Sequence, residues 1–298
     1  MTLSTATSRP GHLIGALPPV AFAALSAGPV AAQEMTSGRA PSNGLDVYYE
    51  VHGDLGSGEV PYLVLHGGMG TVDTDFGDLL PKLAEGRPVI GIEQQGHGRT
   101  GGRDAAVTMA TMRADTLAVL DELGVERVHV VGFSMGGMLA IELGVFAPER
   151  LATLTALSAS QNLDGMHPAI SELNRNPQAA PSPEALELMP TAEDFAEMQK
   201  AFVDNPDGPE QFQRTGAQLQ AFMISGWGWS DDELRSISVP TLMVLGDQDF
   251  MSVEHVARMV GLIDGAQLAV LPDTTHISIL RRVDWLASMI EHRVATAE

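Results

Sequence analysis

The 298-residue chain contains no cysteine and only two lysines, Lys82 and Lys200. The lack of cysteine excludes a disulfide bond, a thiol nucleophile and a thiolate metal site, so the redox compartment cannot be inferred from the sequence. The chain also has far fewer basic residues than acidic residues, and its formal net charge is -21 at pH 7. Nucleic acids and anionic membrane surfaces bind positive patches, so this charge argues against either of them as a partner.

Acidic residues are missing from residues 1–32, where Arg9 is the only charged side chain. An apolar stretch from Leu13 to Leu25 is followed by small residues that end at Ala32, and this order is typical of a signal peptide. We therefore expect cleavage near Ala32 and export to the periplasm or the medium. The alternatives are a plain N-terminal extension or a start codon placed upstream of the true one, and both leave the protein in the cytoplasm. No other segment is long and apolar enough to span a membrane.

Short apolar runs alternate with helical patterns along most of the chain. This alternation predicts an α/β fold, with a mostly parallel sheet of about eight strands that is covered by helices on both faces. The expected strands are 45–51, 62–65, 89–92, 128–133, 151–157, 241–245 and 267–271. The expected helices lie at 109–123, at 135–146, from residue 253 and from about residue 277.

Residues 161–235 interrupt this alternation. The segment is rich in proline and polar residues and shows no clear strand pattern, so we expect several short helices. It therefore reads as an insertion into one sheet domain, which comprises residues 33–160 and 236–298. A long insertion beside a site often acts as a lid, and a helical lid is our prediction. A separate partner-binding module is the alternative.

The stretch Gly132-Phe133-Ser134-Met135-Gly136 follows a predicted strand and opens a predicted helix. In that context the spacing G-x-S-x-G predicts a sharp turn that exposes the serine hydroxyl as a nucleophile. The free N–H groups and the dipole at the start of the helix favour negative charge that develops beside the serine.

A serine hydroxyl is a poor nucleophile without a base, and the base needs a group that orients it. The order expected after such a serine is an acid and then a histidine. Gly246-Asp247-Gln248-Asp249 and Thr275-His276 each follow a predicted strand, at positions where active sites of open α/β sheets gather.

Together these motifs resemble the α/β-hydrolase superfamily, over residues 43–293. The resemblance is carried by Leu65-His66-Gly67-Gly68-Met69-Gly70, by Gln95-Gly96-His97-Gly98, by the serine turn, by Gly246–Asp249 and by Leu271–His276. It implies an α/β-hydrolase fold with Ser134 as the nucleophile, His276 as the general base and Asp249 as the acid, with Asp247 as the competing acid. It also implies an oxyanion hole made by the backbone N–H groups of Met135 and Gly68, with Met69 as the alternative to Gly68.

The same resemblance implies that His66 and His97 are structural. Glu93-Gln94-Gln95 departs from many relatives, which carry an acidic residue or an arginine close to the G-H-G. The four histidines without matched acidic partners, His129, His167, His255 and His292, give no indication of a metal site. We expect neither a metal nor a cofactor.

The implied activity is that of a serine hydrolase that cleaves carboxylic esters of small to medium acyl or aryl groups through an acyl-enzyme, with a small-molecule ester as its partner. A perhydrolase of the cofactor-free haloperoxidase type, a lactonase and a C–C bond hydrolase stay open, and a ligand-binding protein without turnover is the alternative of another class. Five large side chains near the insertion, Met166, Phe222, Met223, Trp227 and Trp229, could form core or pocket wall, and core packing is the prediction.

Overall fold

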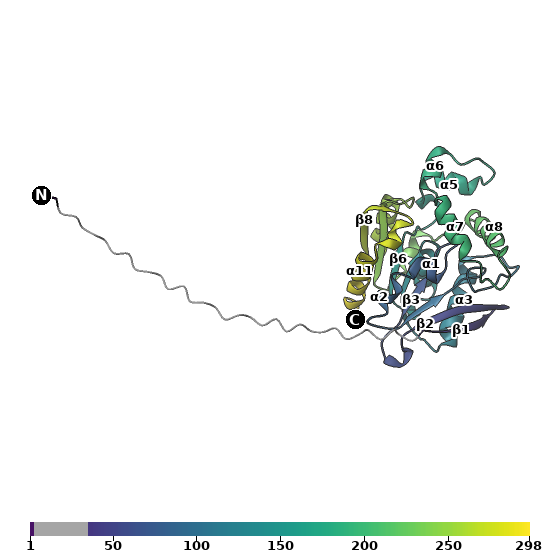
Figure 1. Cartoon of the computed structure of the whole chain (residues 1–298), viewed down its shortest axis with the longest axis horizontal. Coiled ribbons are helices and arrows are strands. Elements are labelled where there is room, and N and C mark those ends of the chain that lie inside the picture. The colour runs from purple at the N-terminus through teal and green to yellow at the C-terminus, as the bar shows by residue number, and fades with distance from the viewer. Residues whose placement is uncertain (3–34) are drawn as a thin grey trace. The chain divides into compact units, whose positions relative to one another are not determined.

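The computed structural model describes residues 1–2 and 35–298 (Figure 1). The chain divides into two units, residues 1–32 and 33–298, and the fold described here is that of the second unit. The predicted signal peptide therefore lies outside the described residues, apart from the first two. Within the described part of the chain, no helix is long and apolar enough to cross a membrane.

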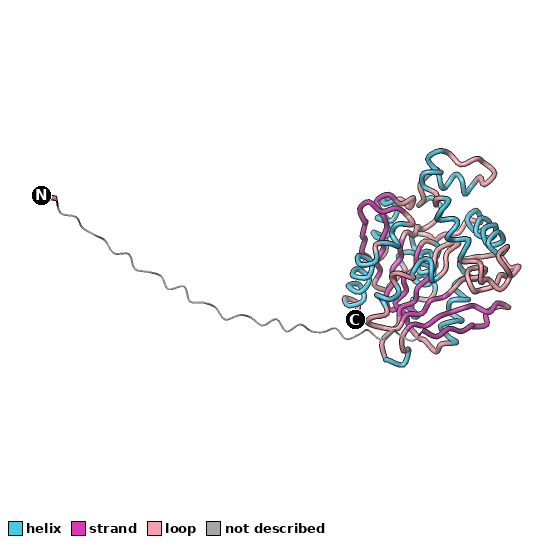
Figure 2. Tube along the Cα trace, viewed as in Figure 1, coloured by secondary structure: helices cyan, strands magenta, loops and turns pink. Residues whose placement is uncertain are grey.

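An eight-stranded sheet in the order β1-β2-β4-β3-β5-β6-β7-β8 runs through this unit, and its strands are drawn in magenta in Figure 2. The first two strands and the β2–β4 pair are antiparallel, and the other neighbours are parallel. The bounds are β1 Met35–Ser42, β2 Leu45–His52, β3 Tyr62–Leu65, β4 Val89–Ile92, β5 Val128–Phe133, β6 Leu151–Leu157, β7 Thr241–Gln248 and β8 Gln267–Thr275. The predicted α/β-hydrolase fold is confirmed.

Helices cover both faces of the sheet because the buried strands alternate their side chains between two apolar clusters. Leu63 and Leu65 of β3 belong to the cluster that includes side chains of α3, α4 and α10. Tyr62 and Val64 belong to the cluster with side chains of α1, α2 and α11. These helices are α1 Val72–Phe76, α2 Leu80–Leu83, α3 Met109–Glu122, α4 Met135–Phe146, α10 Val253–Leu262 and α11 Val283–Ala295.

Residues 161–235 contain five α-helices, a 3₁₀ turn at Leu163–Gly165 and no named strand, and Figure 1 shows α5 to α8 together beyond one end of the strands. Their bounds are α5 Pro168–Arg175, α6 Pro183–Leu188, α7 Ala192–Lys200, α8 Gln211–Ile224 and α9 Asp231–Arg235. Proline stands in the first turn of α5 and of α6, where its missing N–H costs no hydrogen bond. The segment folds back on itself through an isolated bridge between Asn162 and Gly228.

Several element boundaries differ from those expected from the sequence. The strand β1 was not predicted, because its sequence, MTSGRAPS, is polar and lies at the edge of the sheet. The strands β7 and β8 run three and four residues beyond the predicted ends, to Gln248 and Thr275. The expected final helix from about Ile277 is a short 3₁₀ turn, Ser278–Arg281, and α11 begins at Val283.

Candidate active site

The turn between β5 and α4 places Ser134 in a strained backbone conformation. Its φ is 51° and its ψ is -113°, a region that residues other than glycine seldom occupy. The Ser134 N–H donates a hydrogen bond of 2.8 Å to the carbonyl of Leu157 on β6. The strand–turn–helix context predicted for Ser134 is therefore present, and the neighbouring strand holds it.

The two glycines beside Ser134 are required by backbone contacts. A Cβ atom on Gly132 would lie 2.0 Å from the carbonyl oxygen of Gly136, inside any possible contact distance. A Cβ atom on Gly136 would lie 2.0 Å from the carbonyl oxygen of Leu65, at the end of β3. Helix α4 can therefore start close to β3 only because neither position carries a side chain.

Ser134, His276 and Asp249 form a continuous chain of hydrogen bonds. His276 Nε2 lies 3.0 Å from Ser134 Oγ, and His276 Nδ1 lies 2.8 Å from Asp249 Oδ1. Because an aspartate can only accept, we assign the proton to Nδ1, which leaves Nε2 free to accept the serine proton. This is the arrangement of a nucleophile, a base and an orienting acid.

The surroundings of His276 fix the orientation of its ring. Phe250 stacks on it at 3.9 Å between centroids, and Phe133 lies against it at 5.1 Å. Burial raises the pKa of Asp249, but the charge of His276 and its hydrogen bond outweigh burial, so the net pKa lies below the ordinary range. Asp249 is thus held ionised, as an acid that stabilises an imidazolium must be.

The competing acid, Asp247, is not brought to His276. It is the next-to-last residue of β7, its side chain is exposed, and its carboxylate accepts a hydrogen bond of 3.0 Å from the N–H of Thr274 on β8. That backbone hydrogen bond lowers the pKa of Asp247. The structure therefore gives Asp247 a place in strand pairing and leaves Asp249 beside the histidine.

Two backbone N–H groups of residues that line the cavity of Ser134 are candidates for the oxyanion hole. Met135 is the first residue of α4, where a helix provides no acceptor for the N–H. Gly68 lines the same cavity, and among the described residues nothing accepts its N–H. The alternative donor, the Met69 N–H, is occupied by a hydrogen bond of 3.1 Å to His97 Nε2. The geometry thus favours Gly68 over Met69.

His66 and His97 form a buried scaffold under this loop. His66 Nε2 accepts a hydrogen bond from the Gln94 N–H, and His97 Nδ1 donates one to the carbonyl of Gln95. Burial lowers the pKa of His66 to about 4 and that of His97 to about 3. Both rings are therefore neutral near pH 7 and join the loop of Gly67–Gly70 to the loop after β4.

Sequence reasoning missed Asp75, the last residue but one of α1. Its carboxylate accepts a hydrogen bond of 2.7 Å from the Gly67 N–H, one residue before the proposed oxyanion donor. It also lines the cavity that contains Ser134, and burial there raises its pKa from 3.8 to about 6. The only signal was its position in the first helix after the His66–Gly70 loop, which is too general to single out one acid.

Ser134 and His276 open into a cavity of about 270 Å³ whose walls are largely apolar. Seven methionines take part in these walls, and they come from the core and from the inserted segment: Met69, Met135, Met138, Met166, Met198, Met223 and Met251. Core packing was the prediction for five side chains, but three of them, Met166, Phe222 and Met223, line this cavity, although Met166 and Phe222 are also buried. Trp229 is buried and donates its Nε1–H to Glu142, and Trp227 lines a neighbouring pocket.

Metal-binding groups do not gather near this cavity. Across residues 35–298, no three His, Asp or Glu side chains are grouped so that they could hold a metal ion.

Comparison with known proteins agrees with the fold. A family model described as "Alpha/beta hydrolase family" matches residues 62–289. A proline iminopeptidase from Clostridioides difficile is 28% identical over 272 residues, which cover 82% of this chain and 92% of the relative.

Solved structures of other enzymes show the same fold. The structure of Est816, described as an N-acyl homoserine lactone degrading enzyme, is 27% identical with a TM-score of 0.69, and the match covers 85% of this chain and 99% of Est816. A meta-cleavage product hydrolase from Pseudomonas fluorescens is 20% identical with a TM-score of 0.70, covering 87% of this chain and 98% of the other.

Replacement of Gly136 by alanine tests the backbone contact that positions Ser134. We expect Gly136→Ala to lower the free energy of unfolding by about 3 kcal/mol or more, because the new Cβ would overlap the carbonyl of Leu65. The matched control is Gly261→Ala in α10, where no heavy atom lies within 4 Å of the added Cβ. The control should gain up to about 1 kcal/mol from helix propensity. Equal unfolding midpoints in urea for the two variants would contradict the contact.

Asp75 lowers the stability of the folded protein as the pH rises. Its pKa is raised in the folded state, so the ionisation of Asp75 lowers the free energy of unfolding. This loss is complete above about pH 6 and absent below about pH 4. Asp75→Asn removes the charge and keeps an acceptor for the Gly67 N–H. We expect its Tm to exceed that of the wild type by about 2–4 °C at pH 8, the equivalent of about 1 kcal/mol, and to equal it near pH 4. A variant that is less stable at pH 8 would show that the charge supports the loop.

Proposed function

Because the chain belongs to the alpha/beta hydrolase family, we propose that it is a serine hydrolase that cleaves carboxylic esters of small to medium acyl or aryl groups. The observation that supports this most is the hydrogen-bond chain from Asp249 through His276 to Ser134, where Ser134 and His276 line an apolar cavity. The cavity of about 270 Å³ lies just below the usual range of small-molecule sites, roughly 300–1,000 Å³, so it supports a compact acyl group.

The proposed reaction begins when Ser134 Oγ attacks the ester carbonyl while His276 Nε2 takes its proton. Asp249 holds the imidazole tautomer and stabilises the imidazolium. The N–H groups of Gly68 and Met135 stabilise the oxyanion, which collapses as His276 gives the proton to the leaving alkoxide. A water that His276 then activates hydrolyses the acyl-enzyme and restores Ser134. Removing one oxyanion donor typically costs about 10²–10³ in kcat.

The remaining parts of the proposal rest on the sequence. The partner is a small-molecule ester, and the net charge of -21 argues against nucleic acid and anionic membranes. Residues 161–235 act as the lid, since α5 and α8 contribute Ile170 and Leu219 to the cavity of Ser134. Export of the mature chain follows from the pattern of residues 1–32 and stays a prediction.

A lactone is the second candidate substrate. Est816, which is 27% identical over most of both chains, is described as degrading N-acyl homoserine lactones. A lactone is a cyclic ester, so its opening uses the same groups, but the leaving hydroxyl stays attached to the acyl group. The similarity to a proline iminopeptidase makes an amide the natural third substrate to test beside these two.

Variants of the two candidate acids test the proposed triad as a matched pair. We expect Ser134→Ala to abolish hydrolysis of p-nitrophenyl butyrate and Asp249→Asn to lower kcat by about 10³–10⁴-fold. Asp247→Asn should stay within about twofold of the wild type, because it keeps the acceptor for the Thr274 N–H. The measurement is the initial rate at pH 8, with folding checked by circular dichroism.

The same assay contains the outcomes that decide against the proposal. Parallel reactions with an N-acyl homoserine lactone and with prolyl p-nitroanilide rank the ester, lactone and amide bonds by kcat/KM. Hydrolysis that survives in Ser134→Ala would exclude the acyl-enzyme route. A folded wild type that cleaves the amide alone would overturn the ester proposal, and a large loss in Asp247→Asn would move the acid to that residue.

A further inference from the structure

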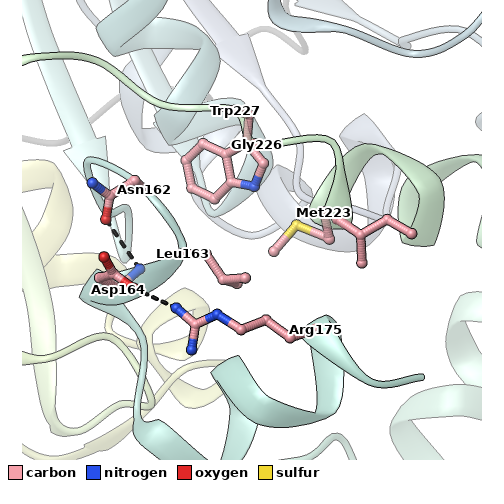
Figure 3. Close-up of a pocket in the computed structure, with 8 residues that line it drawn as sticks. Asn162, Leu163, Asp164, Arg175, Met223, Gly226 and Trp227 are labelled. Atoms are coloured by element: carbon pink, nitrogen blue, oxygen red, sulfur yellow. Dashed lines mark hydrogen bonds and ion pairs between the residues drawn. The ribbon is translucent and has the colours of Figure 1, made fainter. Parts of the chain in front are cut away.

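A second pocket of about 360 Å³ lies beside the catalytic cavity, and Figure 3 shows the side chains around it. Its apolar wall is formed by Leu163, Met223, Ile224 and Trp227. Its polar part contains Asn162 and an ion pair between Arg175 and Asp164. This pocket belongs to the inserted segment, and no step of the proposed mechanism uses it.

Met223 is the side chain common to the two spaces. It lines the catalytic cavity together with Ser134 and His276, and it lines the outer pocket together with Trp227. In Figure 3 it extends from the end of α8 toward Leu163 and Trp227. Met223 is therefore the residue at which the two spaces meet.

The wall next to Met223 is made of aromatic rings that pack against one another. The ring of Trp227 stacks on Phe222, with centroids 5.7 Å apart and planes 23° apart. The following Trp229 is anchored through its Nε1–H to Glu142 and through its carbonyl to Gln161. Methionine has three rotatable bonds and no branch, so its side chain can turn aside where the aromatic wall cannot.

We infer that Met223 is a gate through which the far end of an extended, unbranched acyl chain passes from the catalytic cavity into the outer pocket. The inference rests on the proposed ester hydrolysis and extends its substrate class: besides the small to medium acyl groups that the catalytic cavity holds alone, the two spaces joined accept esters or lactones with a longer, unbranched acyl chain. The carbonyl carbon sits at Ser134, the first carbons fill the methionine-lined cavity, and the distal carbons lie against Trp227 and Leu163.

Size and polarity agree with this division. The catalytic cavity alone is small for a medium-chain ester, whereas the two spaces joined fall well within the usual range of ligand sites. The outer wall offers apolar contact for methylene groups. The ion pair of Arg175 and Asp164 is solvent-exposed, with 48% and 76% of the side-chain surface accessible. A bound acyl chain therefore does not have to bury either of these charges.

Acyl-length profiles of Met223 variants test the gate. The measured quantity is the ratio of kcat/KM for p-nitrophenyl dodecanoate to that for p-nitrophenyl butyrate. We expect Met223→Phe to lower this ratio at least tenfold, because a stiff ring closes the passage, and Met223→Ala to raise it or leave it at the wild-type value. Each methylene that newly reaches the outer pocket should contribute about threefold to fourfold.

Leu219→Phe is the matched control. Leu219 lies one turn earlier on α8 and lines the catalytic cavity but not the outer pocket. Its replacement should lower kcat/KM for both esters together and leave their ratio within about twofold. Equal ratios in Met223→Phe, Met223→Ala and the wild type would overturn the gate while leaving the ester hydrolase in place.

Tryptophan fluorescence separates the gate from turnover. In Ser134→Ala, binding of dodecanoate should change the emission through Trp227, and binding of butyrate should not. Adding Trp227→Phe or Met223→Phe to Ser134→Ala should remove the response to dodecanoate. If the wild type has no esterase activity but shows this fluorescence response, the proposed function is overturned, whereas binding of an acyl chain in the outer pocket still holds. No response to any chain length would overturn the gate.

Discussion

The contact between the backbone of Gly136 and the carbonyl oxygen of Leu65 is the constraint on which the site depends. It lets the start of α4 approach the end of β3, and so it brings the serine turn next to the His66–Gly70 loop. The nucleophile and the proposed oxyanion donors Met135 and Gly68 come from these two neighbouring segments. A side chain at Gly136 would push the segments apart, so the preorganisation on which oxyanion stabilisation depends would be lost.

The loop that carries Gly68 is fixed by groups that do not react. Asp75 accepts the Gly67 N–H, and His97 accepts the Met69 N–H, so the two neighbours of Gly68 are held on both sides. Because burial keeps His97 neutral, its nitrogen can serve as an acceptor. The positive φ of Met69, 64°, is part of the same arrangement. The loop thus holds a strained conformation that leaves the Gly68 N–H without an acceptor among the described residues, as the proposed oxyanion role requires.

Much of this architecture could be predicted from the sequence because the signals are local. The strands 62–65, 89–92, 128–133 and 151–157 were predicted with their observed bounds, since each is a short, almost entirely buried run of mainly apolar residues between turn residues. The order of Ser134, Asp249 and His276 followed from motifs at strand ends. The choice between Asp247 and Asp249 is different, because it depends on a bend after β7 that aims one carboxylate at His276 and the other at the β8 backbone.

What the sequence could not supply depends on contacts between distant segments. The polar edge strand β1 has no apolar pattern and exists because β2 pairs with it. Asp75 is distinguished from other acids only by the Gly67 N–H that faces it. The use of Phe222 and Met223 as cavity wall depends on how α8 lies over the sheet, which periodicity alone does not determine.

The division of roles between core and insertion has a consequence for specificity. The groups proposed to act on the carbonyl, namely Ser134, His276 and the N–H of Met135, lie directly after β5, directly after β8 and at the start of α4, where the packed sheet and helix position them. The walls that would meet the rest of the substrate come largely from methionines and from short helices between prolines. A rigid reacting centre with a deformable wall tolerates variation in substrate shape, because rotation of a thioether costs little compared with movement of a strand. Proteins of this fold can therefore share the reacting groups and differ in the bonds they cleave. We expect the substrate preference of this chain to depend on the part of the cavity wall that α5 and α8 contribute.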